Sequence, residues 1–183
     1  MNSEEIRMNE AKPEPNWAFK MIELIHDNPL MRRLRNPYRM LKDAGLEKGM
    51  KVLEVGCGPG VFTIPAAELV GENGVVYAID IHPRAIEKVR EKAQRAGAKN
   101  VIPILANAAK TGLPDESIDL AFVFGLKHAA GGLESIIREI HRVLKPGGIL
   151  AYETRSSKIK TLIKKLGFEF LEKKGNILRF RKL

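Results

Sequence analysis

The hydrophobic residues fall into short uninterrupted runs that alternate with segments of helical period. Five runs have the length and composition of buried strands: 51–55, 75–80, 101–105, 118–124 and 149–152. Three segments between them place their apolar residues on one helical face: 63–70, 86–96 and 133–144. Strands that alternate with helices in this way imply a parallel sheet with helices packed against it.

The C-terminal part of the chain departs from this alternation. Residues 158–166 predict a short basic helix. Residues 168–173 and 177–181 predict two strands of a hairpin around Lys174-Gly175-Asn176. We therefore expect an α/β fold, a Rossmann-like doubly wound sheet of seven strands, mostly parallel, with an antiparallel C-terminal hairpin.

The N-terminal part is predicted to lie outside the sheet. Residues 1–16 are polar and contain Pro13 and Pro15, which disfavour a helix, so we expect a disordered tail. No signal peptide or membrane span is recognised, because no apolar run is long enough. The predicted division is a tail at 1–16 and one domain at 17–183, made of short amphipathic helices at 17–45, a core at 50–154 and a basic helix plus hairpin at 155–183.

A glycine-rich turn separates the first two predicted strands. Gly56, Gly58 and Gly60 let the backbone turn without Cβ clashes and let a ligand lie directly against the main chain. Asp80 ends the second strand, twenty residues after Gly60, which is the distance at which a carboxylate can take both hydroxyls of a ribose. The ligand is therefore expected to contain a nucleoside.

Two details argue against a dinucleotide. The dinucleotide fingerprint places its third glycine three residues after the second, and Val61 stands there instead. Glu54, two residues before Gly56, would put a carboxylate near the turn where a pyrophosphate would sit, and like charges repel in a partly dry pocket. A ligand with an amino group and a sulfonium, and no phosphate, has no such conflict.

Four ordered motifs resemble one known family. They are 52–60, 78–80, Leu113-Pro114-Asp115-Glu116-Ser117-Ile118-Asp119, and Arg142-Val143-Leu144-Lys145-Pro146-Gly147-Gly148. Their order and spacing over roughly residues 50 to 154 resemble the class I methyltransferases that use S-adenosylmethionine, and among them the small domain of the ubiquinone and menaquinone biosynthesis enzymes (methyltransferase type 11). The resemblance implies the strand order 3-2-1-4-5-7-6 and an N-terminal helical lid over the ligand.

The resemblance also implies a set of cofactor contacts. Glu54 and the backbone of the glycine turn would meet the methionyl part, Asp80 the ribose, and Ile81 the adenine. The expected cofactor-binding residues are Glu54, Gly56, Cys57, Gly58, Gly60, Asp80, Ile81, Asn107, Ala108 and Phe124. S-adenosyl-L-methionine is then the cofactor, and S-adenosyl-L-homocysteine the product.

The chain departs from this family after the third strand. Related domains often carry an aspartate there to meet the adenine amino group, whereas this chain has Asn107 in a longer, neutral loop. The carbonyl oxygen of Asn107 can still accept a hydrogen bond from that amino group, but a role as a turn residue is equally compatible with the sequence.

The sequence names no catalytic residue with certainty. Methyl transfer from a sulfonium has an activated leaving group, so the protein mainly positions two reactants and excludes water. His128 follows the fourth strand, where the resembling family forms the floor between cofactor and substrate, and it is either a base, a substrate-orienting group or an ordinary loop histidine. No residue spacing indicates a metal site.

Composition and charge leave the methyl acceptor open. Cys57 is the only cysteine, so no intrachain disulfide is possible and a cytoplasmic setting is expected. The net charge of +9 is concentrated at 151–183, with ten basic and three acidic side chains, which indicates either a solvated face or an acidic partner such as RNA. Six lysines in that region could contact phosphates: Lys158, Lys160, Lys164, Lys165, Lys173 and Lys174.

The favoured interpretation is a methyltransferase acting on a small molecule. Short connections leave only 17–45 and 125–132 to cover the acceptor, so the site suits either a large substrate or closure by a second subunit of a homodimer. The alternatives are an RNA methyltransferase that uses the basic C-terminal region, a domain that binds the cofactor without turnover, and, more remotely, a nicotinamide-dependent oxidoreductase.

Overall fold

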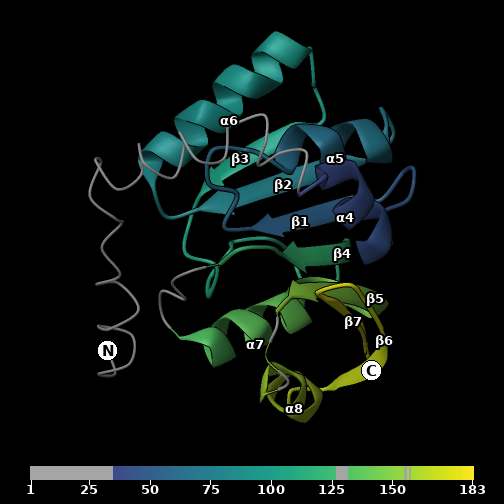
Figure 1. The fold of residues 1–183 in the computed structure, drawn as a ribbon. Coiled ribbons are helices and arrows are strands. Elements are labelled where there is room, and N and C mark those ends of the chain that lie inside the picture. Colours follow the sequence, from purple (N-terminus) through teal and green to yellow (C-terminus); the bar gives the residue numbers. More distant parts are fainter. Residues whose placement is uncertain (1–34, 127–131, 155, 157) are drawn as a thin grey trace, which may run out of the picture.

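One seven-stranded sheet organises the molecule. The computed structural model describes residues 35–126, 132–154, 156 and 158–183. The sheet has the order β3-β2-β1-β4-β5-β7-β6, which is the order that the resemblance implied (Figure 1). Its strands are β1 (Lys51–Val55), β2 (Val75–Asp80), β3 (Val101–Leu105), β4 (Ile118–Val123), β5 (Leu144–Glu153), β6 (Phe168–Lys174) and β7 (Ile177–Lys182). Strands β1 to β5 are parallel, and β7 pairs antiparallel with both β5 and β6, so the predicted fold class is confirmed.

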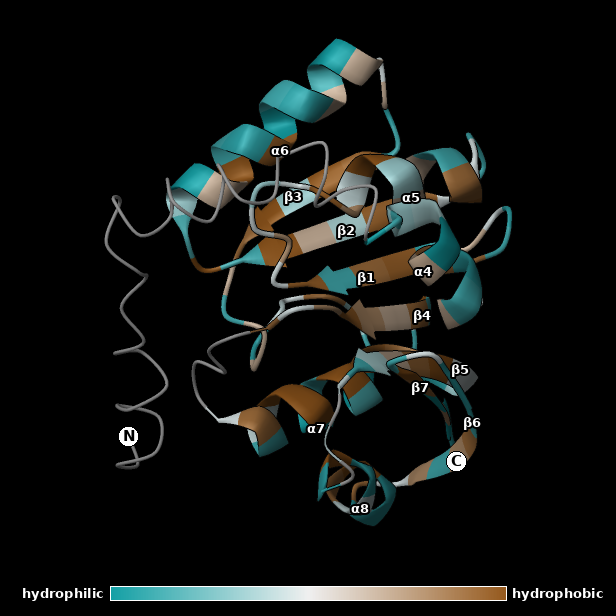
Figure 2. Ribbon diagram, in the orientation of Figure 1, coloured by the Kyte–Doolittle hydropathy of each residue, from teal (hydrophilic) through white to brown (hydrophobic). Residues whose placement is uncertain are grey.

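Helices cover both faces of this sheet. They are α4 (Pro37–Ala44), α5 (Thr63–Val70), α6 (Pro83–Ala96), α7 (Leu133–Val143) and α8 (Lys158–Lys165). The apolar sides of α4 and α5 pack on one face, where α6 also lies over β2, and those of α7 and α8 pack on the other. Figure 2 shows apolar residues on the central strands and a polar outer surface on α6. Within the described residues, no helix has both the length and the apolar composition needed to cross a bilayer.

Local signals set the ends of α6. His82 is the N-cap residue, and its Nδ1 accepts a hydrogen bond from the backbone N–H of Arg84 at 3.2 Å. Pro83 occupies the first turn, where a missing amide hydrogen costs no intrahelical bond. Gly97 closes the helix in the left-handed conformation, with φ 65°. The helix therefore begins only three residues after Asp80, which is three residues before the segment 86–96 that the periodicity predicted.

The predicted start of the fifth strand was wrong. We expected Lys145-Pro146-Gly147-Gly148 to separate the helix from a strand beginning at Ile149, whereas β5 begins at Leu144, directly after α7. The four residues form an irregularity within the strand, because Leu144 pairs with Ile118 and the next pair joins Ile149 to Leu120. A Cβ on Gly148 would lie 2.8 Å from the carbonyl oxygen of Lys145, so the irregularity requires a glycine there.

The connection between β3 and β4 contains no helix and is held by side chains of α7. The backbone N–H and the Oγ1 of Thr111 donate to Glu139 at 2.8 and 2.7 Å. Arg142 donates to Glu139 and to the carbonyl oxygen of Leu113, and it pairs with Asp115. Two of the motifs that carry the family resemblance are therefore in direct contact, because Leu113 and Asp115 belong to one and Arg142 to the other.

The N-terminal segment is described only from Arg35 onward. The expected tail at 1–16 and most of the helical segment at 17–45 lie outside the described residues. The described part of that segment is Arg35 together with α4 and the turn that follows it. The helix packs on α5, where Tyr38 donates to Glu68, and its C-cap Gly45 lies against the guanidinium of Arg179 on β7. The α4 helix therefore joins the parallel and the antiparallel parts of the sheet.

Candidate functional site

The glycine turn after β1 is fastened to the end of β2. The N–H groups of Gly56 and Cys57 both donate to the carbonyl oxygen of Ile79, at 2.9 and 3.0 Å, and Gly60 donates to Cys57 at 3.0 Å. Gly58 lies between them with φ 51°, a backbone conformation that residues other than glycine rarely adopt. The carboxyl ends of two adjacent strands are thereby closed by the main chain of this turn, in which Gly56 and Gly58 are half-buried.

Gly60 allows α6 to lie close to this turn. Its φ is 78°, and a Cβ there would approach Cγ2 of Val89 on α6 to 3.1 Å. Cys57 is buried beside the same helix, and burial together with the nearby carboxyl groups raises the pKa of its thiol. The Cys57 side chain therefore stays protonated, and only its backbone is expected to meet a ligand.

Asp80 is held in place by the turn on one side and by α6 on the other. Its Oδ2 accepts from the backbone N–H of Gly58 at 2.9 Å, and its Oδ1 accepts from the N–H of His82 at 2.9 Å. Each carboxylate oxygen can accept a further hydrogen bond, so two ribose hydroxyls remain compatible with this geometry. Ile81 stands between Asp80 and His82 and is half-buried.

Glu54 is a buried carboxyl group at the end of β1, with a side chain only 2% exposed. Its Oε2 accepts from Oγ1 of Thr63 at 2.6 Å, and no described residue donates to its other oxygen. Desolvation by burial raises the pKa of Glu54 to about 8, and the negative charge of Asp80 adds to this, although the Thr63 hydrogen bond opposes it. A group in this state favours a cationic ligand, which would compensate the charge of the ionised form.

The structure gives less support to the three remaining cofactor contacts that we expected, at Asn107, Ala108 and Phe124. Oδ1 of Asn107 accepts from the N–H of Ala109 at 2.9 Å, so Asn107 is a turn residue, and its contact with adenine stays a prediction. Ala108 is half-buried against the core on the α7 face. Phe124 is only 6% exposed and packs against Phe62 with 5.2 Å between ring centroids, so it offers little side-chain surface to a ligand.

The structure gives no account of His128, which lies outside the described residues together with 127 and 129–131. Its role as a base or as an orienting group stays a prediction. Across the part of the chain that is described, no three His, Cys, Asp or Glu side chains gather into a group that could hold a metal ion.

The sheet register aligns the candidate residues along one edge. Glu54 lies opposite Ala78 of β2 and Phe122 of β4, and Phe122 in turn lies opposite Ala151 of β5. Two residues further along each strand, the same register places four residues side by side at the carboxyl edge of the sheet: Asp80, Gly56, Phe124 and Glu153. The edge therefore continues past the expected cofactor contacts to the ends of β4 and β5.

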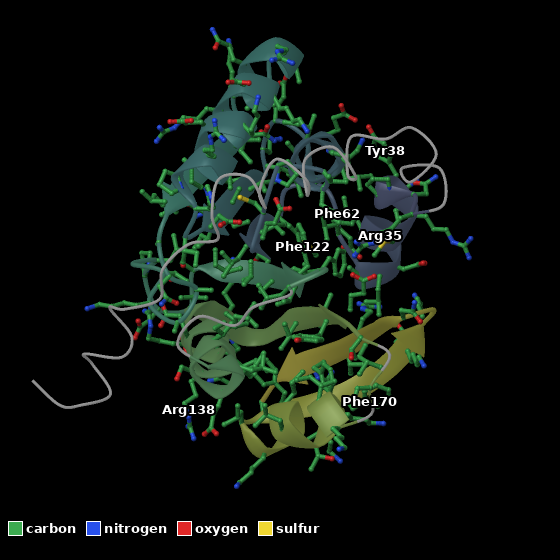
Figure 3. The ribbon with its side chains drawn as sticks, turned by 60° about the vertical axis from the view of Figure 1, so that its left-hand side comes forward. Arg35, Tyr38, Phe62, Phe122, Arg138 and Phe170 are labelled. Carbon is green, nitrogen blue, oxygen red and sulfur yellow. The ribbon has the colours of Figure 1, made fainter. Side chains whose placement is uncertain are left out.

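Three residues at this edge were missed by the sequence analysis. Thr63 hydrogen-bonds Glu54, and Arg35 forms an ion pair with Glu153 at the end of β5. Figure 3 shows Arg35 beside Phe62, and its guanidinium carbon is 5.4 Å from the ring centroid. Arg35 and Glu153 are separated by 118 positions, so no local pattern could have indicated this pair.

Comparisons with known proteins bear on the same region. A family model described as "Methyltransferase domain" matches residues 46–176. A demethylmenaquinone methyltransferase of Geobacillus stearothermophilus is 35% identical over 119 residues, which are 64% of this chain and 50% of that protein. The protein of the same name from Staphylococcus aureus is 38% identical over 113 residues, covering 61% of this chain and 46% of that protein. The chain thus spans about half the length of these curated relatives.

A solved structure matches over nearly the whole chain. The crystal structure of a SAM dependent methyltransferase from Aquifex aeolicus has a TM-score of 0.77 at 26% identity, and the match covers 92% of this chain and 97% of that chain. The match is therefore longer than residues 46–176, which the family model covers.

Proposed function

The chain belongs to the methyltransferase domain family, and from this premise we propose that it is an S-adenosylmethionine-dependent methyltransferase that acts on a small molecule. Two carboxyl groups flanking the glycine turn carry the proposal. Glu54 at the end of β1 suits the ammonium of an amino acid, and Asp80 at the end of β2 suits the hydroxyls of a ribose. An adenosine joined to an amino acid carries both groups, and it brings no phosphate to repel either carboxylate.

The chain's own contribution to the reaction is to bind and orient. The bound cofactor supplies a methyl group that is already activated as part of a sulfonium. The main chain of the glycine turn would meet the methionyl part. Asp80 is fixed by two backbone N–H groups, and Thr63 holds the carboxyl of Glu54. Fixed groups of this kind contribute by positioning reactants rather than by transferring protons.

Titration with S-adenosylhomocysteine tests the binding half of this proposal. Isothermal calorimetry should show binding by the wild-type protein and roughly ten- to hundredfold weaker binding by Asp80→Ala, since charge-assisted hydrogen bonds contribute about 1.5 to 3 kcal/mol. Asp43→Ala, on α4 and remote in sequence from the turn, is the matched control and should bind normally. Unchanged affinity in Asp80→Ala would refute the assignment. A thermal shift with NAD but none with S-adenosylhomocysteine would favour an oxidoreductase instead.

Incubation with methyl-labelled S-adenosylmethionine and a cell extract tests the catalytic half. We expect the label in a small organic molecule, which is the type of acceptor that the names of the demethylmenaquinone methyltransferases imply for those relatives. Label found in no fraction, despite binding of the cofactor, would indicate a domain without turnover. Label found in RNA would favour the second candidate function.

An RNA acceptor remains the second candidate because several lysines of the C-terminal region form no ion pair with any residue that the structure describes. Lys160 lies over the ring of Phe170, with Nζ 3.3 Å from the centroid, and Lys174 pairs with Glu172 at 3.4 Å. The other four lysines proposed for phosphate contacts make no ion pair within the described residues: Lys158, Lys164, Lys165 and Lys173. Affinity for RNA that falls steeply as salt rises would support this candidate, and no binding at low salt would remove it.

A cytoplasmic location and a homodimer complete the proposal. The location is suggested by Cys57, which is buried and unpaired. Sedimentation of the purified protein tests whether a second copy is present to close the site.

A further inference from the structure

The first turn of α6 is hydrogen-bonded to the carboxylate proposed to bind the ribose (Figure 1). One backbone donor to Asp80 comes from the glycine turn, and the other is the N–H of His82, 2.9 Å from Oδ1. The next residue, Pro83, is the first of the helix and has no N–H to offer. The orientation of Asp80 therefore depends on how the backbone of His82 is held.

The side chain of His82 holds that backbone in place. His82 is the N-cap residue of α6, with an extended backbone at φ −93° and ψ 117°, and its Nδ1 accepts from the N–H of Arg84 at 3.2 Å. Its carbonyl oxygen accepts from the N–H of Ala85 at 3.0 Å, which begins the hydrogen bonds of the helix. The residue is only 5% exposed, so water has little access to replace these bonds.

The same helix forms one wall of the glycine turn. Ile86 and Val89, in the first two turns of α6, belong to one buried cluster with Cys57. A Cβ on Gly60 would approach Cγ2 of Val89 to 3.1 Å, so the turn and the helix are in close contact. Fraying at the start of α6 would therefore loosen Asp80 and the wall of the turn together.

A second helix of this chain begins in the same way. Asn36 precedes Pro37 at the start of α4, and its Oδ1 accepts from the N–H of Arg39 at 3.1 Å. An asparagine before a proline is therefore a working N-cap in this protein. Histidine is not among the residues usually preferred at this position, which are Ser, Thr, Asp and Asn. An aspartate at 82 would place a second negative charge beside Asp80, whereas the imidazole accepts the hydrogen bond without one.

We propose that His82 is a positioning residue for the cofactor. The inference rests on the proposed function and adds to it a residue that acts through Asp80 rather than by touching the ligand. By capping α6, His82 keeps its own N–H directed at Oδ1, so the carboxylate is already ordered when the ribose binds. Without the cap, the carboxylate has to be ordered during binding, and the affinity for the ribose hydroxyls falls.

Two nucleosides that differ only in the ribose hydroxyls test this coupling. Adenosine carries both hydroxyls and 2′,3′-dideoxyadenosine carries neither, and the ratio of their Kd values, measured by NMR titration, gives the preference for the hydroxyls. His82→Ala should reduce this preference about fivefold, the usual effect of losing an N-cap. His82→Asn restores an acceptor at the cap and should keep the preference within about twofold of wild type. An unchanged preference in His82→Ala, or an equal loss in His82→Asn, would overturn the proposal.

The α4 helix provides a matched control for general destabilisation. Asn36→Ala removes an equivalent cap from a helix that makes no hydrogen bond to Asp80 within the described residues. It should lower the free energy of unfolding about as much as His82→Ala does, and leave the preference for adenosine unchanged. An equal loss of preference in both variants would mean that His82 has a merely structural role, and would refute the proposal.

A double substitution shows whether His82 acts through Asp80. In an Asp80→Ala background, the further change His82→Ala should leave the Kd for adenosine unchanged, because the carboxylate on which the cap acts is gone. A further weakening by about fivefold in that background would contradict the proposal.

Hydrogen exchange in the wild-type protein measures the same coupling without any substitution. Coupling between two sites is reciprocal, so S-adenosylhomocysteine should slow exchange of the Arg84 amide several-fold and leave the Arg39 amide unchanged. No slowing at Arg84 would count against the proposal.

Failure of the proposed function has a different signature. If the wild type binds neither S-adenosylhomocysteine nor adenosine, the cofactor assignment is wrong and this inference falls with it. If the wild type binds both, and only the His82 variants depart from the expected pattern, the proposed function stands and this inference alone is refuted.

Discussion

The buried carboxyl group of Glu54 leads to a prediction that links stability, pH and ligand affinity. Glu54→Gln keeps the shape of the side chain and an acceptor oxygen for the Thr63 hydroxyl, but it removes the ionisation. The pKa of Glu54 is raised from 4.5 to about 8, so the folded state prefers the protonated form more strongly than the unfolded chain does. The resulting contribution to stability is fully present below pH 4.5 and is lost as the pH rises through 8.

The magnitude follows from the same pKa values. Between pH 4.5 and pH 7 the unfolded chain gains ~1.4 kcal/mol per pH unit from ionising this group, and the folded protein gains almost nothing. Relative to Glu54→Gln, the free energy of unfolding of the wild type should therefore fall by about 3 kcal/mol over this interval. Other carboxylates titrate in both proteins, so their contributions cancel in the difference.

Ligand affinity should change in the opposite direction with pH. If the ammonium of S-adenosylhomocysteine binds the ionised carboxylate, only ~1% of the free protein is competent at pH 6 and about half at pH 8. The wild-type Kd should then decrease by about fiftyfold from pH 6 to pH 8, with release of a proton on binding. Glu54→Gln should bind the ligand weakly, with a Kd that is nearly independent of pH in this range.

Two assays check these results. Urea unfolding of wild type and variant at pH 5 and pH 7 measures the stability difference, and calorimetry at pH 6, 7 and 8, in buffers with different ionisation enthalpies, measures affinity and proton release. Glu72→Gln, at an exposed carboxylate, is the matched control and should behave as wild type in both. A wild-type Kd that does not vary with pH, or a stability difference that is the same at pH 5 and pH 7, would refute the reasoning.

Three further substitutions test the supports of the site. Gly60→Ala should destabilise the fold by about 1 to 2 kcal/mol in urea unfolding, because alanine is strained at this positive φ and its Cβ crowds Val89; no change would contradict the close approach. Arg142→Ala should cost about 1 to 3 kcal/mol by leaving Glu139 and a backbone carbonyl without their donor, and protection from hydrogen exchange should drop in residues 106–117 rather than at the glycine turn. Gly148→Ala should lower the melting temperature by several degrees, since its Cβ would lie 2.8 Å from a carbonyl oxygen, and an unchanged melting temperature would argue against the tight irregularity in β5.

The sheet could be predicted because each strand carries its own signal. Except at the start of β5, the runs of buried residues predicted the strands to within one or two positions, and the turn at Gly175 predicted the hairpin, which pairs as expected. The order of the strands came from the family resemblance, since periodicity alone does not say which strands are neighbours. The helix α6 was also predicted to within three residues of its start, because its apolar face follows from residues close in the chain.

The parts that could not be predicted depend on contacts between distant residues. Nothing near Thr63 indicates that its hydroxyl will meet Glu54, and nothing near Arg35 indicates Glu153. The start of β5 at Leu144 was missed for a similar reason. A proline followed by two glycines usually separates a helix from the next strand. Here Leu144, before Pro146, already pairs with Ile118 in the sheet. Tertiary pairing overrides the local signal in that case.

A crystal structure with S-adenosylhomocysteine tests the central claim most directly. The account predicts the ligand at the carboxyl ends of β1 and β2, with the ribose hydroxyls within hydrogen-bonding distance of Asp80 and the amino group on the side of Glu54. A ligand bound elsewhere, or a glycine turn that stays empty at saturating concentration, would contradict the claim and leave only the fold.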